Sequence, residues 1–250
     1  MVTSVRDTYT REMYGRTGLF ASWPLPSAPV ALGDVGVLKR NLFRKETTLT
    51  GLGIGFVTGP AGKPADVDYS TAEFVSVAAS ATAHTAGPGP SAGLTIRFTR
   101  AGAILFQARD CVMETIENLP GLEASLRDLR LDKTWRPEWC IITSLLRTGP
   151  TAIVISDEHG AVMELRADAS ALTAAIPVAV ALGDFAVSSC AGITFKVLSK
   201  EGATPLFGVS QLRRKPWGQS ALVFRGGGDQ PALPEVELAS VAWSDDDDPE

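Results

Sequence analysis

The residues of this chain that could do chemistry are few, and their spacing does not assemble a catalytic site. Nucleophilic catalysis by cysteine or serine requires a base such as histidine within hydrogen-bond reach. The two histidines are His84, in a segment rich in Gly and Pro, and His159, in a predicted hairpin turn. Neither lies in a motif such as a nucleophile elbow. We therefore expect both to be exposed, and we expect no enzyme of this kind.

Acidic pairs give no stronger indication of catalysis or of metal binding. Asp157 and Glu158 share a predicted turn, and Asp110 and Glu114 lie near the start of a predicted helix. Acidic residues in turns and on helix faces are mostly solvated surface groups, so neither pair indicates a glycosidase-type site. The sequence has no CxxC or HxxxH pair and no loop of alternating acidic ligands, so no metal and no other cofactor is expected. The run of aspartates at 245–248 is interpreted as a solvated terminus.

The cysteines and the terminal segments indicate where the protein resides. Cys111, Cys140 and Cys190 are odd in number, widely spaced and set among apolar neighbours, so we expect buried free thiols in a reducing compartment. Residues 1–7 lack the apolar core of a secretory signal. The longest apolar run, at 171–183, is too short for a membrane helix and contains a proline. These features predict a cytoplasmic protein.

Charge is divided unevenly along the 250 residues. Residues 229–250 contain eight Asp or Glu and no Lys or Arg, so the preceding residues contribute +3 to a net charge of −5. Basic patches on that body could bind anionic lipid, where each well-placed cation contributes about 1 kcal/mol. Ordinary surface is the alternative, and nucleic acid is not expected because no aromatic-basic motif is present. The candidate lipid-binding residues are Arg6, Arg11, Arg16, Lys39, Arg40, Arg44, Lys45, Arg213, Arg214 and Lys215.

The strongest structural pattern is a pair of strands between Phe74 and Phe106. Apolar residues alternate with small or polar ones over 75–83 and again over 94–99, and the segment between them is rich in Gly and Pro. This alternation predicts a hairpin with one apolar face. Such a ribbon can lie on a soluble sheet, or it can join copies of itself in a closed ring of strands whose outer face meets lipid.

The remaining pattern predicts an α+β fold, with a twisted, mostly antiparallel sheet and peripheral helices. The chain contains 24 Gly and 16 Pro, which favour strands and turns over long helices. A short amphipathic helix is predicted over 1–13, and a longer one between Cys111 and Leu131. A strand is predicted at 139–146, and a second hairpin is predicted from 152–156 and 161–167.

The three glycines at 226–228 predict a boundary in the chain, because consecutive glycines favour a flexible linker. The sequence therefore divides into a body at 1–225, a linker at 226–228 and an acidic tail at 229–250. The tail also holds apolar residues, which a purely solvated terminus would not need. They are Leu233, Val236, Leu238, Val241 and Trp243.

The order of the predicted elements resembles that of a known family. Strands at 75–83 and 94–106 precede the helical region at 116–122, the strand at 139–146, the second hairpin and the late sequence Pro-Leu-Phe-Gly at 205–208. In layout and size this order resembles the pore-forming domain of bacterial and fungal gasdermin-like proteins. The likeness covers roughly residues 25 to 225.

The resemblance implies a latent effector that forms pores. Its two hairpin regions would lengthen into membrane strands after a protease, cutting after a residue such as Arg225, removes the inhibitory tail. The released body would move from the cytoplasm to anionic membranes, form a homo-oligomer and cause cell death in defence. On this hypothesis the candidate membrane-strand residues are Val75, Val77, Leu94, Ile96, Phe98, Ile153, Ile155 and Leu165.

The alternative hypothesis is a soluble β-rich binding or scaffold protein whose acidic tail docks a partner. Alternation of apolar residues fits a permanent soluble sheet equally well. An enzyme is the third hypothesis, and it would require an activity that depends on residues such as Cys111, Cys140, His84 or His159.

Overall fold

The computed structural model describes residues 4–24, 30–71, 73–82, 91–168, 186–199, 202–214 and 236–240. Within these residues the chain is α+β, with mostly antiparallel strands and peripheral helices, which confirms the predicted fold class. The elements are α1 (Val5–Thr17), β1 (Phe20–Ala21), β2 (Asp34–Lys39), β3 (Leu42–Thr48), η1 (Thr50–Leu52), β4 (Ala65–Ser70), β5 (Val75–Thr82), β6 (Ser91–Phe98), β7 (Ile104–Thr115), α2 (Leu119–Leu131), β8 (Trp139–Thr148), β9 (Thr151–Ser156), β10 (Val162–Asp168), β11 (Ala186–Ala191), β12 (Ile193–Ser199), β13 (Ala203–Arg214) and β14 (Val236–Ser240).

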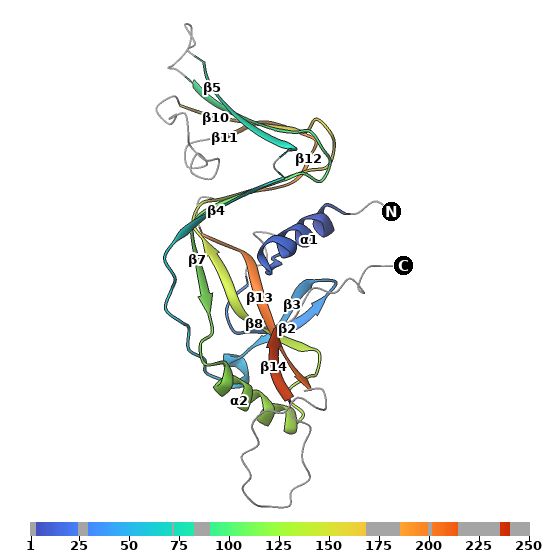
Figure 1. Cartoon of the computed structure of the whole chain (residues 1–250), viewed down its shortest axis with the longest axis vertical. Helices are drawn as coiled ribbons and strands as arrows, with labels where there is room; N and C mark the ends of the chain where they lie inside the picture. The colour runs from blue at the N-terminus through green and yellow to red at the C-terminus, as the bar shows by residue number, and fades with distance from the viewer. Residues whose placement is uncertain are drawn as a thin grey trace, which may run out of the picture. The chain divides into compact units, whose positions relative to one another are not determined.

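The strands of the described residues form two sheets (Figure 1). The ten-stranded sheet has the order β1-β13-β8-β7-β9-β12, with β14 on β13, β2 on β8, β3 on β2 and β4 on β7. The four-stranded sheet has the order β11-β10-β6-β5. By contacts the chain divides into two compact units. Unit 1 comprises Met1–Pro29, Ala61–Met113 and Leu146–Leu206, and unit 2 comprises Val30–Pro60, Glu114–Leu145 and Phe207–Glu250.

Helix α1 covers one face of β7 and β9 in unit 1. Its first turn is capped by Ser4, whose hydroxyl accepts a hydrogen bond from the Asp7 amide at 3.2 Å, and it ends at Gly18 in the left-handed conformation. Tyr9 and Met13 on α1 are buried, in a cluster that also contains residues of β7 and β9. The helix predicted at 1–13 is confirmed, but in the described residues it runs from Val5 to Thr17, and its sequence is less amphipathic than predicted because its buried residues include Thr10 beside Tyr9 and Met13.

The opposite face of β7 and β9 is covered by the four-stranded sheet. Leu105 of β7 and Val154 of β9 pack in one cluster with Ile96 of β6 and with Met163 and Leu165 of β10. All six residues of β9 are buried, since the strand is covered on both faces. This double burial explains why the four residues from Ala152 to Ile155 are all apolar and do not alternate with polar ones.

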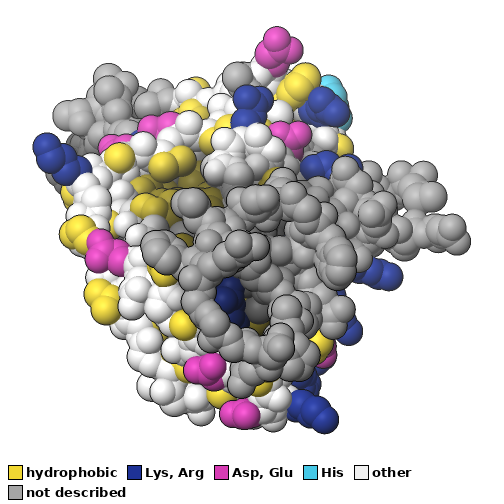
Figure 2. Space-filling model, turned by 60° about the horizontal axis from the view of Figure 1, so that its bottom comes forward, with side chains coloured by type: hydrophobic (Ala, Val, Ile, Leu, Met, Phe, Trp, Pro, Cys, Tyr) yellow, Lys and Arg dark blue, Asp and Glu magenta, His cyan; other side chains and the backbone are white. Residues whose placement is uncertain are grey.

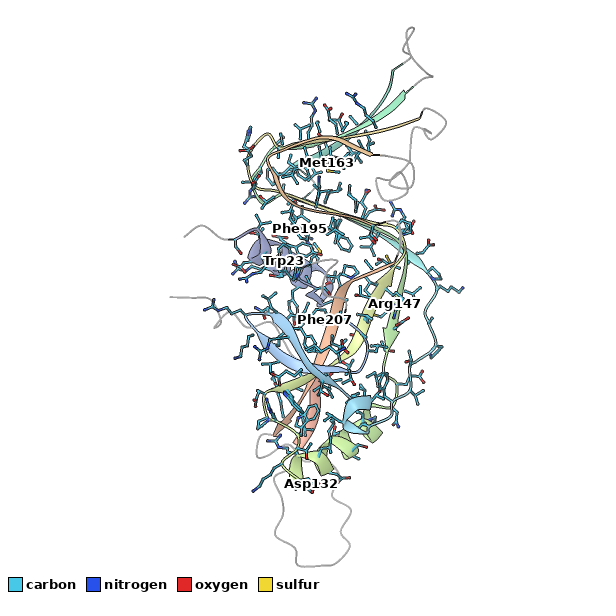
Figure 3. All side chains as sticks on the ribbon, turned by 180° about the vertical axis from the view of Figure 1, so that it is seen from behind. Trp23, Asp132, Arg147, Met163, Phe195 and Phe207 are labelled. Atoms are coloured by element: carbon cyan, nitrogen blue, oxygen red, sulfur yellow. The ribbon has the colours of Figure 1, made fainter. Side chains whose placement is uncertain are left out.

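Two aromatic rings support the α1 side of this unit. Trp23 and Phe195 stack with ring centroids 4.2 Å apart, and both rings lie near Tyr9 (Figure 3). Contacts of this kind add about 0.5–1.5 kcal/mol beyond the area they bury. They join β12 and the segment after β1 to the helix.

Unit 2 has its own core beneath α2. Leu122 and Leu126 of α2 are buried with Val35 of β2 and with Trp139 and Ile141 of β8. The side chain of Asn118 caps the helix, and a proline occupies its first turn, where its missing N–H leaves no bond unmade. These residues make the helix amphipathic and fix where it begins.

Two predicted elements differ from the structure. The helix predicted between Cys111 and Leu131 was wrong in its first part, because β7 continues through Thr115 and the proline–glycine pair starts α2 instead of breaking it. The second hairpin was also wrong: β9 pairs with β7 and β12, whereas β10 pairs with β6 and β11. The turn at 157–160 therefore connects two stacked sheets and not two neighbouring strands.

The predicted burial of the three thiols holds for two of them. Cys111 and Cys140 are buried, but Cys190 is exposed. Cys190 lies on β11, which among the described strands pairs with β10 alone and is therefore an edge strand. Apolar sequence neighbours do not bury a residue that stands at the edge of a sheet.

Truncation of Leu126 should destabilise the protein far more than truncation of Leu131 on the same helix. Leu126 is fully buried, whereas Leu131 is 56% exposed. Leu126→Ala should reduce the free energy of unfolding by about 2–5 kcal/mol because it opens a cavity, and Leu131→Ala should change it by less than about 0.5 kcal/mol. Urea unfolding followed by far-UV circular dichroism measures both. Equal losses would contradict the placement of α2.

Candidate functional site

The candidate site is the four-stranded sheet of β5, β6, β10 and β11, here called the hairpin sheet (Figure 1). The first predicted hairpin is confirmed, because β5 and β6 pair antiparallel from Val75 opposite Phe98 to Thr82 opposite Ser91. Its tip at 83–90 lies outside the described residues. β6 then pairs with β10, and β10 pairs with β11, so the sheet joins two segments distant in sequence.

One face of the hairpin sheet is apolar. Ile96 lies opposite Val77 on one side and opposite Met163 on the other, and Leu94 lies opposite Leu165. Because side chains alternate between faces along each strand, these residues share one face with Val75 and Phe98. The Ile96 and Met163 side chains are fully buried against β7 and β9. Figure 3 labels Met163 on this sheet.

The predicted membrane-strand residues divide into two groups in the structure. Ile153 and Ile155 lie on β9, in the core beneath α1, and not on the hairpin sheet. Met163 also lies on the apolar face but was not predicted. It could have been found from the sequence, because it precedes Leu165 by two residues and residues two apart on a strand share a face. The six predicted residues that lie on the apolar face are Val75, Val77, Leu94, Ile96, Phe98 and Leu165.

The opposite face of the hairpin sheet is polar and carries all the charge of its strands. Arg97 lies opposite Ser76 and Val162, and Glu164 lies opposite Thr95. By the same alternation the remaining charged residues of β10, at 166 and 168, lie on this face too. No charged residue of the four described strands lies on the apolar face. The four described strands therefore carry all of their charge on one face of the sheet.

Several candidate lipid-binding cations already have partners. The Lys45 ammonium lies 2.7 Å from a carboxylate oxygen of Asp34, whose side chain is almost fully buried. A guanidinium nitrogen of Arg44 lies 3.2 Å from Glu46. In unit 1, Arg6 pairs with a neighbouring aspartate, and the Arg16 guanidinium lies 5.6 Å from the centre of a tyrosine ring.

Other candidate cations are exposed at the described surface. Lys39 and Arg40 lie at the tight turn between β2 and β3, where Arg40 has a positive φ of 49°. Arg11 and Arg213 are also exposed, and Lys215 lies outside the described residues. Arg214 lies in β13. Figure 2 shows Lys and Arg side chains at several places on the described surface, with several of them along its right-hand edge.

Part of the acidic tail forms a strand. β14 pairs antiparallel with β13, from Ser240 opposite Ser210 to Val236 opposite Arg214, and Glu237 lies opposite Arg213. Of the predicted tail residues, Val236 and Leu238 belong to β14, whereas Leu233, Val241, Trp243 and the predicted cleavage residue Arg225 lie outside the described residues. The tail strand therefore extends the sheet at β13 and does not pair with the hairpin sheet.

The cysteine and histidine candidates show no catalytic geometry in the described part of the chain. Burial raises the pKa of the Cys140 thiol to about 11, and this thiol lies 3.4 Å from the Gly36 carbonyl oxygen. Burial also raises the pKa of Cys111. His159 is exposed in its turn. Within the described ranges, no three His, Cys, Asp or Glu side chains are grouped as metal ligands.

Comparison with known proteins gives one structural similarity. No protein-family model matches the chain, and no curated protein is significantly similar to it in sequence. A solved structure described as "Cryo-EM structure of the Gasdermin A3 membrane pore" is similar to the chain, with 10% identity, a TM-score of 0.37 and coverage of 94% of this chain and 100% of that one. The resemblance predicted from the order of elements is confirmed at this level.

Neither helix of the described residues has the length and apolar character that crossing a bilayer requires.

The three thiols should differ in reactivity in the order that their environments dictate. At pH 8, Cys190 should react with Ellman's reagent within minutes, whereas Cys140 should react very slowly because its raised pKa leaves about one thiol in a thousand ionised. Cys190→Ser should remove the fast phase, and Cys140→Ser should leave it intact. All three thiols should react in guanidinium chloride. A fast phase that survives Cys190→Ser would contradict the edge position of β11.

Proposed function

We propose that this protein is a latent pore-forming effector whose hairpin sheet becomes the membrane-spanning part of an oligomer. The observation that carries the proposal is the separation of charge on this sheet. Its apolar face includes Ile96, Met163 and Leu165, and every charged residue of its described strands lies on the other face. Strands that span a membrane need this pattern, with one face toward lipid and the other toward water.

The length of uncharged sequence supports the same proposal. The described strands have six to eight residues, whereas a membrane strand needs about 9–11. The chain between β5 and β6 and the chain between β10 and β11 would have to supply the difference. Residues 74–96 contain no Asp, Glu, Lys or Arg, and residues 169–185 contain one charged residue, Asp184. Alternation from Ala186, which lies opposite Arg166, would place Asp184 on the polar face of a lengthened β11. Lengthened hairpins would therefore place no charged residue on the face toward lipid.

Assembly follows from the edges of the sheet. In the described residues, β5 pairs with β6 alone and β11 with β10 alone, so each has an edge available for hydrogen bonds. An unpaired edge in lipid costs several kcal/mol for each unsatisfied group. Pairing β5 of one copy with β11 of the next would satisfy both edges, and a closed ring of copies would leave none. The proposed active form is therefore a homo-oligomer.

The membrane must also replace the contacts that the apolar face makes in the monomer. Leu94, Ile96 and Leu165 are buried against β7 and β9, and their exposure to water would cost about 25 cal/mol per Å2. Contact of the apolar face with lipid would recover this free energy. Exposed cations such as Lys39 and Arg40 would add attraction to anionic headgroups. Anionic membranes are thus the proposed partner.

The tail is the proposed restraint. β14 occupies an edge of β13, and an occupied edge cannot pair with another chain. The eight acidic residues of 229–250 also oppose the +3 of the body and would weaken its attraction to anionic lipid. Cleavage by a protease after Arg225 would allow both effects to be lost. In this proposal the uncut protein is cytoplasmic, and removal of its tail leads to cell death in defence.

A soluble binding or scaffold protein is the second candidate function. It is favoured by the complete burial of Ile96 and Met163 against β7 and β9, since the apolar face already has a protein partner. In that case the acidic tail would serve as a docking segment for another protein, and its removal would leave a stable monomer.

Cleavage of the tail should switch on membrane permeability. A recognition site for a specific protease replaces Gly226–Gly228, and the folded chain is cut after purification. The cut protein should release dye from anionic vesicles at least tenfold faster than the uncut protein, because the β13 edge and the cations become available. Neutral vesicles should leak more slowly. If neither the cut nor the uncut protein released dye, the scaffold function would be favoured.

Adjacent substitutions on β5 should separate the two faces of the hairpin sheet. Val77 and Ala78 are both exposed in the monomer, so arginine at either position should leave it folded. Val77→Arg should abolish leakage by the cut protein, because a cation on the lipid face costs about 2–4 kcal/mol per copy near the bilayer midplane. Ala78→Arg, on the polar face, should retain most of it. Equal leakage by the two variants would contradict the assignment of faces.

A further inference from the structure

The hairpin sheet is not held equally tightly along its width. On the inner strands β6 and β10, the side chains of Ile96 and Met163 are fully buried. On the edge strand β5 of the same apolar face, Val75 is only half-buried and Val77 is 44% exposed. The contact between the two sheets of unit 1 is therefore closed in the middle and incomplete at β5.

A cavity of about 140 Å3 lies beneath this loosely held edge. Its walls come from β5, β4 and β7, all within unit 1. Its lining combines polar side chains from β4 and β7 with apolar ones from β5 and β7. The lining residues are Asp68, Tyr69, Ser70, Val75, Val77, Leu105 and Gln107.

Gln107 makes the packing at this edge unfavourable. Its side-chain oxygen Oε1 is buried and has no hydrogen-bond partner among the residues that the structure describes. A buried acceptor without a donor destabilises the closed arrangement, and it regains hydrogen bonds when water enters. The pocket beside it also gives Val75 and Leu105 fewer protein contacts than a close-packed core would supply.

The roots of the hairpins, in contrast, are firmly bonded to the ten-stranded sheet. The Thr71 hydroxyl, between β4 and β5, accepts a bond from the Ile104 amide at 2.7 Å. The Ser156 hydroxyl, at the end of β9, donates to the Arg100 carbonyl at 2.6 Å and accepts from the Ala103 amide at 3.0 Å. These bonds tie the segments before β5 and between β6 and β7 to β7 and β9.

We propose that the hairpin sheet opens from its β5 edge, over the Gln107 cavity, and turns on the bonded roots at Thr71 and Ser156. Opening admits water to Gln107 and frees β5 first, while β6 and β10 separate from β7 and β9 last. This order exposes the edge strand that another copy must reach before the apolar core is exposed to water. The role of the opening in pore formation depends on the proposed function, but the opening itself does not.

Hydrogen–deuterium exchange on the uncut full chain tests the order of opening. In the native protein, β5 amides should exchange faster than β10 amides. Gln107→Leu replaces the unpartnered acceptor with an apolar group of similar size, so β5 exchange should slow by about fivefold or more while β10 exchange changes little. Gln107→Met, whose unbranched side chain adapts to irregular space, serves as the second variant in case leucine does not fit.

Ser76→Val is the matched control, because it adds apolar area to β5 on the face away from the cavity. It should not reproduce the slowing at β5. Equal exchange of β5 and β10 in the native protein, or equal effects of Gln107→Leu on both strands, would overturn the proposal. Dye release by cut Gln107→Leu should slow by a similar factor. Loss of leakage from every cut form, native included, would contradict the proposed function and leave the exchange result standing.

Discussion

The rest of unit 1 depends on the burial of β7 and β9 on both faces. One face packs beneath Tyr9 and Met13 of α1, and the other packs beneath the hairpin sheet. Both faces of a strand in this position are buried, and β9 is accordingly apolar at each of its four central residues, with a buried threonine and serine at its ends. The same central strands therefore hold helix α1 and cover the apolar face of the hairpin sheet. Any change that uncovers that surface must break contacts with these two strands.

The hairpin sheet meets two demands with one alternation of residues. In the monomer, the period of two turns Leu94, Ile96 and Leu165 toward the core and places Arg97 and Glu164 in water. A lipid-facing strand needs the same division, so the resting and the proposed active forms require no different sequence. For the same reason the alternation of residues is ambiguous by itself, because it specifies an apolar face and a polar face but not whether protein or lipid covers the apolar one.

Elements with a clear period were predictable from the sequence, and elements fixed by pairing partners were not. The β5–β6 hairpin follows from alternation, and α1 follows from helical spacing. The second hairpin was missed because the turn containing His159 resembles a hairpin turn, whereas the double burial of β9 places it between other strands. The end of β7 was missed because its last residues also fit helical spacing. Exposure of Cys190 depends on an edge position that no local pattern encodes.

The ion pair between Lys45 and Asp34 limits how the body can respond to a charged surface. Its carboxylate is almost fully buried, and the ammonium lies 2.7 Å away, so this cation is already neutralised at close range. A phosphate that drew Lys45 away would leave the buried Asp34 carboxylate without its cation, which is energetically costly. The long-range field then arises from fewer residues than the composition suggests. At physiological ionic strength, where screening acts over about 8 Å, such a body would sense a bilayer only on near contact.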